Sequence, residues 1–389
     1  MTLHRIILSI LVSMSLSAME FGEFYRQALQ NSPYLKGNAL RVDAAKEEAR
    51  ITTRYKNPTL EFEYSRFDAA NGGSDNGQRI ALSQPVRLWG VGDARESVAQ
   101  ALRSRAKSGY ALTRALFSKR VLGLYVHYKR DLQLLHLFDE ASAIAKRIYE
   151  ISLARYQNGT IAKADTIQAK LDYKLAQAKQ KEAELAKLQS YYDLLAFAGF
   201  TEEVALQSDY SEPLSDADSQ NNPLLQLHRS KANLARSQER LYSNKIEWVN
   251  LYAEYEGKPN DDIYRVGLNI PLALFNTKKE ERQKALLEAK RAKLLAENSS
   301  RSLSIRLKAL KKERTLLYEL VQRFEAGLKD GEELLGLFEE GYRIANVNIV
   351  QLQQVKAALI KTKASLIEAR AKLELNIIET NYLQGKYND

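Results

Sequence analysis

The sequence predicts a mainly α-helical protein with a small antiparallel β part, arranged as two tandem repeats of long coiled-coil helices and β-hairpins. Three observations indicate this fold class. The seven prolines leave residues 86–212 and 272–389, which number 127 and 118, without proline, and such tracts rich in Ala, Leu, Lys, Glu and Gln form long helices. A short segment of alternating polar and apolar residues precedes each tract. Landmarks of one half also recur in the other half.

The tandem repeat rests on three pairs of landmarks, separated by 190 residues in the first case and by 186 in the other two. The pairs are Asn31-Ser32-Pro33 with Asn222-Pro223, Pro85 with Pro271, and Tyr156-Gln157-Asn158-Gly159 with Tyr342-Arg343-Ile344-Ala345. We therefore expect a first repeat over residues 19–205 and a second over 223–389. Residues 206–222, acidic and rich in Ser, Asp, Asn and Pro, are expected to form the linker.

Residues 1–18 are predicted to be a signal peptide. His4 and Arg5 precede the apolar run Ile6–Leu16, and the small residues Ser17 and Ala18 follow it. A basic start, a short apolar run and a small-residue cleavage site are typical of export signals, and this run is too short to span a bilayer. The alternative is a buried N-terminal helix in a cytosolic protein.

The two alternating segments are predicted to be β-hairpins at about residues 59–86 and 246–271. Each of their strands is about 9–11 residues long, which is the length of a strand that crosses a bilayer obliquely. A soluble sheet with one wet face would show the same alternation. In hydrocarbon, however, four strands would leave unpaired edges, so other copies of the chain would have to complete a barrel. Three copies would supply twelve strands, enough for a channel.

The helical tracts contain residues that repeat every seven positions, which predicts side-by-side helices with a left-handed supercoil. One series is Ala164, Leu171, Ala178, Leu185 and Tyr192, and the other is Leu352, Leu359, Leu366 and Leu373. A single helix over about residues 278–340 would be roughly 95 Å long at 1.5 Å per residue. Taken alone, the heptads are equally typical of a dimeric cytosolic coiled coil.

Together these features resemble the outer-membrane efflux protein family typified by TolC, over about residues 21–387. The resemblance implies a homotrimer in which a 12-stranded outer-membrane β-barrel continues into a periplasmic α-helical tunnel. Such a channel is the passive exit duct of a tripartite efflux or type I secretion system in a Gram-negative outer membrane. Its implied partners are outer-membrane lipid, a periplasmic adaptor protein and an inner-membrane pump, with no nucleic acid.

The resemblance also implies site residues. The breaks at Asn158-Gly159-Thr160 and Ile344-Ala345-Asn346 match the adaptor-facing tips of the family's helical hairpins, although Ala345 stands where glycine is usual. Asp165, Gln351 and Gln354 match positions at the periplasmic aperture. The two glutamines replace aspartates of the family pattern, and Val347 replaces an arginine.

The residues give no indication of catalysis. The chain has no cysteine, its three methionines lie at the N-terminus, and His4, His127, His136 and His228 form no ligand pattern. We therefore expect no enzyme activity, no cofactor and no metal site.

Two alternatives from other classes remain open at this point. The formal net charge of +10 would suit a cytosolic coiled-coil scaffold that binds nucleic acid. An exported adaptor-like or filamentous protein would share the signal peptide and the long helices, but it would not need four strands of bilayer length.

Overall fold

The computed structural model describes residues 18–68, 70, 72–216, 219–259 and 261–388. Apart from Ala18, the predicted signal peptide lies outside the described residues. The chain forms two compact units. The hairpin unit comprises Met1–Leu35, Leu116–Ser215 and Lys308–Tyr382, and the sheet unit comprises Lys36–Ala115, Asp216–Leu307 and Leu383–Asp389. Each unit takes segments from both predicted repeats, whose boundaries stay a prediction.

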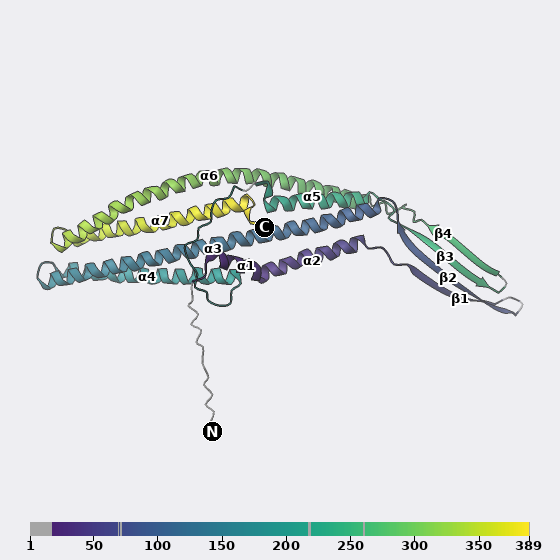
Figure 1. The fold of residues 1–389 in the computed structure, drawn as a ribbon, viewed down its shortest axis with the longest axis horizontal. Coiled ribbons are helices and arrows are strands. Elements are labelled where there is room, and N and C mark those ends of the chain that lie inside the picture. The colour runs from purple at the N-terminus through teal and green to yellow at the C-terminus, as the bar shows by residue number, and fades with distance from the viewer. Residues whose placement is uncertain (1–17, 69, 71, 217–218, 260, 389) are drawn as a thin grey trace, which may run out of the picture. The chain divides into compact units, whose positions relative to one another are not determined.

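The predicted fold class is confirmed, since the elements are long helices and one small antiparallel sheet (Figure 1). The helices are α1 (Phe21–Asn31), α2 (Pro33–Thr53), α3 (Val91–Gln157), α4 (Lys163–Ala198), α5 (Pro223–Tyr242), α6 (Lys279–Arg343) and α7 (Ile349–Leu383). The strands are β1 (Thr59–Asp68), β2 (Ser74–Arg87), β3 (Trp248–Lys258) and β4 (Asp261–Asn269). Two short 3₁₀ helices, η1 (Ser219–Asn221) and η2 (Lys386–Asn388), complete the described elements.

The proline-free tracts contain the two longest helices, α3 with 67 residues and α6 with 65. Both run without a break because no residue in them lacks a backbone N–H or fixes an unsuitable φ. The helix expected over residues 278–340 is therefore confirmed. The first part of α3 and of α6 belongs to the sheet unit, and the remainder belongs to the hairpin unit.

In the hairpin unit, α3 lies antiparallel to α4 and α6 lies antiparallel to α7 (Figure 1). One apolar cluster joins all four helices, and its most buried members are Ile148, Ala169, Tyr342 and Leu352. Deleting a side chain from such a core costs about 2–5 kcal/mol. The two hairpins are therefore held together as one bundle in this unit.

The two heptad series behave differently, and only one of them forms a packing seam within the chain. Leu352, Leu359 and Leu366 of α7 are buried, whereas Leu171 and Leu185 of α4 are 57% and 68% exposed. Four small residues of α4 that are buried or half-buried also recur every seven positions: Ala169, Ala176, Ala183 and Ser190. Small side chains let α4 approach the neighbouring helices closely. Leu171 and Leu185, here called the α4 leucine row, lie outside this contact and are exposed.

An aromatic cluster joins the beginning of α1 to the first part of the predicted linker in the hairpin unit. The ring of Phe21 lies 3.9 Å from that of Tyr125 and 4.8 Å from that of Tyr210, measured between centroids. The Tyr125 hydroxyl donates to the carbonyl of Gln207 at 3.1 Å and accepts from the Tyr210 N–H at 3.2 Å. Residues 206–215 are thus packed against the helices although they contain no helix or strand.

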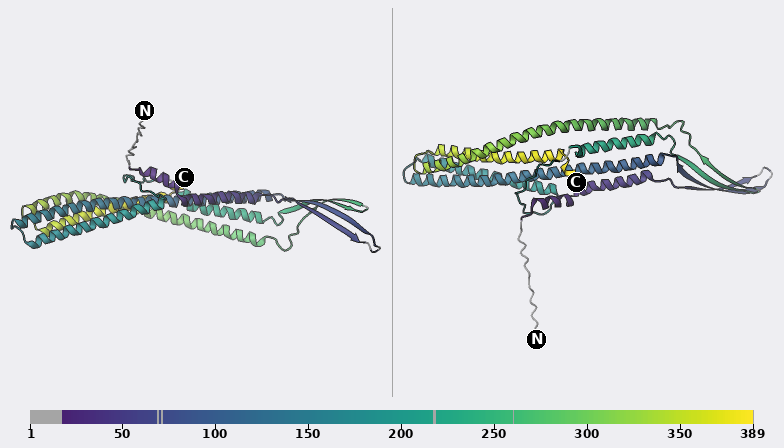
Figure 2. Two further views of the ribbon diagram at one scale, coloured as in Figure 1. Left: turned by 90° about the horizontal axis from the view of Figure 1, so that it is seen from below. Right: turned by 45° about the horizontal axis from the view of Figure 1, so that its top comes forward.

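In the sheet unit, the four strands lie side by side in the order β1-β2-β3-β4, all antiparallel (Figure 1; two further views are given in Figure 2). The two predicted hairpins pair with each other through β2 and β3, where Leu82 lies opposite Ala253 and Ile80 opposite Tyr255. A small core joins α3 and α5 in the same unit through Val98 and Leu234, among others.

The two helical hairpins turn in the same way although one uses glycine and the other alanine. Gly159 has φ +73° and Ala345 has φ +72°. In the first turn the N–H of Thr160 donates to the carbonyl of Arg155 at 2.9 Å, and in the second the N–H of Asn346 donates to the carbonyl of Gly341 at 2.8 Å. The left-handed conformation strains a residue that has a Cβ.

We predict that Ala345→Gly stabilises the protein by about 0.5–1 kcal/mol, because relief of the left-handed strain exceeds the added flexibility of glycine in the unfolded chain. The matched change Gly159→Ala should destabilise it by about 1 kcal/mol. Denaturant unfolding of the purified protein, followed by circular dichroism, measures both. A loss of stability in Ala345→Gly would contradict the turn described here.

Candidate functional site

The sheet has one apolar face, and that face is exposed. Along β1, Leu60, Phe62 and Tyr64 are 70%, 68% and 62% exposed, and along β4 Tyr264 and Val266 are 76% and 86% exposed. The strand register places the inner strands' apolar residues on the same side: Ile80, Leu82, Leu251, Ala253 and Tyr255. Monomeric soluble proteins rarely expose a contiguous apolar surface of this kind, which instead marks contact with a partner or a membrane.

The opposite face of the sheet is polar and crosslinked by ion pairs. Arg79 of β2 contacts Glu61 and Glu63 of β1 at 3.2 and 3.4 Å, and Glu254 of β3 at 3.8 Å. Arg265 of β4 contacts Glu256 at 2.6 Å and also pairs with Glu254. The ion pairs thus link all four strands across one surface. The sheet therefore separates an apolar side from a charged, water-compatible side.

The outer strands β1 and β4 each have one partner in the chain, so each leaves one backbone edge unpaired. Such an edge has a row of N–H and C=O groups that must bond to water or to another strand. This arrangement agrees with the expectation that one chain does not close its own sheet.

The predicted tip residues lie together at one end of the hairpin unit (Figure 1). Both turns are exposed, and so are all six predicted residues: Asn158, Gly159, Thr160, Ile344, Ala345 and Asn346. Arg155 joins the turns, since its Nη1 donates to the carbonyl of Tyr342 at 2.6 Å. The Tyr342 hydroxyl lies 2.7 Å from the Ser152 Oγ.

The three predicted aperture residues differ in their surroundings. Asp165 is half-buried in the first turn of α4, where its negative charge suits the helix N-terminus. Gln351 forms two hydrogen bonds with Asn348 at the start of α7. Its backbone N–H donates to Asn348 Oδ1 at 2.9 Å, and its side-chain Oε1 accepts from the Asn348 backbone N–H at 3.3 Å. This is a capping box at the start of α7. The side chain of Gln354 is exposed.

Polar contacts between α4 and α7 were missed by the sequence reasoning. Lys356 of α7 is 6% exposed and pairs with Asp172 of α4. One turn away, Gln168 Nε2 donates to Gln353 Oε1 at 2.9 Å. Burial of a lysine without a partner is costly, so the aspartate is essential to its position.

A second group of ionic contacts joins α7 to the other hairpin and to its own partner helix. Lys363 lies 2.9 Å from Glu140 of α3 and 2.9 Å from Glu332 of α6. No local pattern reveals these pairs, because Glu140 and Lys363 are 223 residues apart.

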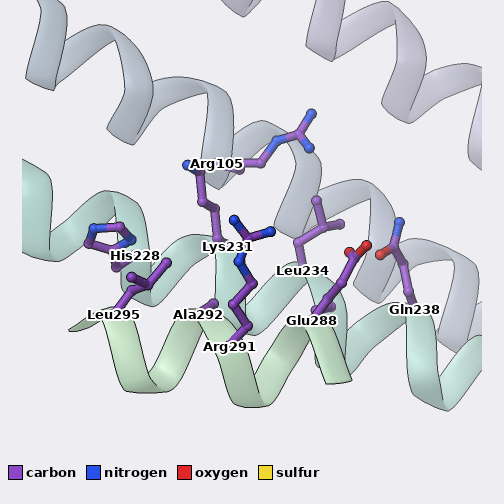
Figure 3. A pocket seen from close by; sticks show the side chains of 10 residues that line it. Arg105, His228, Lys231, Leu234, Gln238, Glu288, Arg291, Ala292 and Leu295 are labelled. Atoms are coloured by element: carbon purple, nitrogen blue, oxygen red, sulfur yellow. The ribbon is translucent and has the colours of Figure 1, made fainter. Parts of the chain in front are cut away.

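A pocket of about 360 Å³ lies in the sheet unit (Figure 3). Arg105 from α3, His228 and Lys231 from α5, and Glu288 and Arg291 from α6 give it a charged lining. Burial and the nearby Lys231 lower the pKa of His228, so its imidazole is neutral at pH 7. The lining contains no hydroxyl or thiol group.

Within the described residues, no three His, Cys, Asp or Glu side chains are grouped as metal ligands. None of the helices in the described part of the chain combines the length and apolar character of a membrane-spanning helix.

We predict that Asp172→Ala destabilises the protein by about 3 kcal/mol, because it leaves the Lys356 charge buried and unpaired. The double change Asp172→Leu and Lys356→Met should recover most of this loss, since it removes both charges. Glu182→Ala is the control on the same helix. It breaks an exposed pair with Lys179 and should cost less than about 0.5 kcal/mol. Denaturant unfolding compares the variants, and equal losses for Asp172→Ala and Glu182→Ala would refute the role given to the buried pair.

Comparison with known proteins shows what the sequence and the fold are similar to. Residues 24–199 match the family model described as outer membrane efflux protein. No curated protein sequence matches the chain. Similar folds are found in crystal structures of the outer membrane protein VceC from Vibrio cholerae, the CmeC outer membrane channel of Campylobacter jejuni and the open state of the MtrE outer membrane channel of Neisseria gonorrhoeae.

The structural similarity extends over almost the whole chain at low sequence identity. For VceC the TM-score is 0.78 at 14% identity, covering 94% of this chain and 95% of VceC. For CmeC the values are 0.75 and 14%, covering 94% and 85%, and for MtrE they are 0.76 and 13%, covering 93% and 88%. At such identities the likeness establishes the fold. In sequence, residues 24–199 are similar to the outer membrane efflux protein family.

Proposed function

We propose that this protein is an outer-membrane channel, the passive exit duct of a tripartite efflux or type I secretion system. The observation that supports this most directly is the four-stranded sheet with an exposed apolar face, a charged opposite face and two open edges. In the proposed channel the apolar face contacts lipid and the charged face lines the water-filled interior.

Open edges favour assembly from several copies. An unpaired backbone group in hydrocarbon costs several kcal/mol, so β1 of one copy must pair with β4 of the next. Three copies then give twelve strands, a barrel wide enough for a channel. We therefore propose a homotrimer in the outer membrane.

The outer faces of the helices in the hairpin unit agree with this assembly. The α4 leucine row is exposed within one chain, and so are Leu316 and Leu337 of α6, at 65% and 64%. Neighbouring copies would cover these side chains and build a helical tunnel. A cytosolic coiled-coil scaffold would also bury leucine rows, but it would leave the apolar face of the sheet in water.

At the periplasmic end, we propose that the tips Asn158-Gly159-Thr160 and Ile344-Ala345-Asn346 meet the adaptor, which connects the duct to an inner-membrane pump. Their exposure at one end of the hairpin unit supports this. Asp165 and Gln354 are the proposed side chains at the aperture. Gln351 is assigned there with them, although its side chain also caps α7.

A direct test is to isolate outer membranes and ask whether the protein runs as a heat-modifiable trimer. Phe62→Arg should reduce the trimer in the outer membrane strongly, because each arginine facing the bilayer midplane costs about 2–4 kcal/mol. Ser83→Arg is the matched control. Its side chain belongs to the charged face, and it should leave the trimer in place.

Two results would oppose the proposal. One is a soluble monomer or dimer of the unaltered protein. The other is equal insertion of the Phe62→Arg and Ser83→Arg variants, which would mean that the apolar face does not contact lipid.

A further inference from the structure

The pocket of about 360 Å³ in the sheet unit is lined by α3, α5 and α6 (Figure 3). Its lining residues on α5 and on α6 follow one another at intervals of three or four positions, so they share one face of each helix. They are His228, Lys231, Leu234, Ala235 and Gln238 of α5, and Glu288, Arg291, Ala292 and Leu295 of α6. Small-molecule sites have volumes of roughly 300–1,000 Å³, so the pocket could hold a small organic molecule.

One part of the pocket is apolar. Leu234, Ala235 and Ala292 are buried, whereas Leu295, one turn from Ala292 on α6, is 41% exposed. An apolar body in the pocket would remove the exposed part of Leu295 from water, which is favourable.

The rest of the lining is mainly cationic, and its cations lack acidic partners. Arg105, Lys231 and Arg291 make no ion pair and no side-chain hydrogen bond in the part of the chain that the structure describes. Elsewhere between the same two helices, Arg282 of α6 pairs with Glu239 of α5 at 2.7 Å. The pocket is therefore a place where α5 and α6 leave positive charge uncompensated.

The arrangement of these charges favours an anion. Figure 3 shows the Arg291 side chain extending from α6 toward α5, the helix that carries Lys231. The lining has three positive charges and the single negative charge of Glu288. Burial lowers the pKa of His228, and the Lys231 ammonium lowers it further. A positive charge that disfavours an imidazolium ion favours a negatively charged ligand in the same place.

We propose that this pocket binds a small organic anion, whose acidic group contacts Lys231 and Arg291 and whose apolar body covers Leu295. The ligand class is a sulfonate, phosphate or carboxylate attached to an aromatic or aliphatic group. Charge-assisted hydrogen bonds from lysine and arginine to such oxygens are strong. The proposal does not rest on the channel function, because every lining residue belongs to the sheet unit of one chain.

The direct test is a calorimetric titration of the purified full-length protein with naphthalene-2-sulfonate, with detergent micelles alone as the blank. This probe has an aromatic body and one negative charge that does not titrate near neutral pH. Inorganic sulfate lacks the body and 2-naphthol lacks the charge, so each should bind about tenfold more weakly or worse. Added NaCl should weaken sulfonate binding, because salt screens the attraction.

Four single changes at exposed positions test the lining without disturbing packed side chains. Arg291→Gln and Lys231→Gln should each weaken sulfonate binding about tenfold. Glu288→Gln should strengthen it roughly twofold or more, since it removes a repulsive charge. Lys290→Gln is the matched control, because this exposed lysine of α6 does not line the pocket. It should leave binding unchanged.

The result for Glu288→Gln separates a binding site from a merely structural cluster, because damage to the fold would not tighten binding. The proposal is overturned if naphthalene-2-sulfonate does not bind, or if sulfate or 2-naphthol binds equally well. It is also overturned if Lys290→Gln weakens binding as much as Arg291→Gln does. All of these outcomes leave the channel proposal standing, since that proposal is tested through the trimer in the outer membrane.

Discussion

The unsatisfied backbone at the two edges of the sheet is the constraint on which the rest of the structure depends. β1 and β4 each bond to one strand only, and the face between them is apolar and exposed. Neither property suits a single chain in water, and a membrane tolerates the apolar face only when the edges are paired. A strand from another copy would pair each open edge, and the apolar face could then be placed in a membrane. The duplicated hairpin agrees with this, because each hairpin contributes two strands to the same sheet.

The charged face of the sheet has a different physical role. Arg79 and Arg265 both contact Glu254, so the pairs form a network across β1 to β4. Exposed ion pairs contribute little to stability individually, about 0–1 kcal/mol. Their more important effect is on register, because a one-residue slip would move every charge to the apolar face. The alternation of charged and apolar residues therefore defines the two faces of the sheet more than it adds to the stability of the sheet.

Much of this could be predicted from the sequence, because strands and long helices have local periods. Prolines bounded the tract that contains α3 and α4 and marked the start of the tract that contains α6 and α7, and alternation located the four strands. Spacing alone could not show that the leucines of α7 point inward and Leu171 of α4 outward. A heptad period shows that residues share one face of a helix, but it does not show which element that face contacts. The pair of Lys356 with Asp172 depends on residues 184 apart and left no local trace. Gln351, by contrast, could have been recognised, because Asn348 precedes it at capping-box spacing.

Near the tips, the two helical hairpins make different contacts, although their sequences repeat. Tyr342 is 1% exposed, and Ser152 and Arg155 of the first hairpin bind its hydroxyl and its carbonyl, whereas Tyr156, its counterpart in the first repeat, is 41% exposed. The second hairpin is thus anchored in the first by a buried side chain, and Lys356 adds a buried charge to the same joint. Any separation of the hairpins has to expose that tyrosine and break the ion pair in the same movement. A movement that keeps the two hairpins together and shifts the bundle as one body breaks neither contact and is physically the easier one.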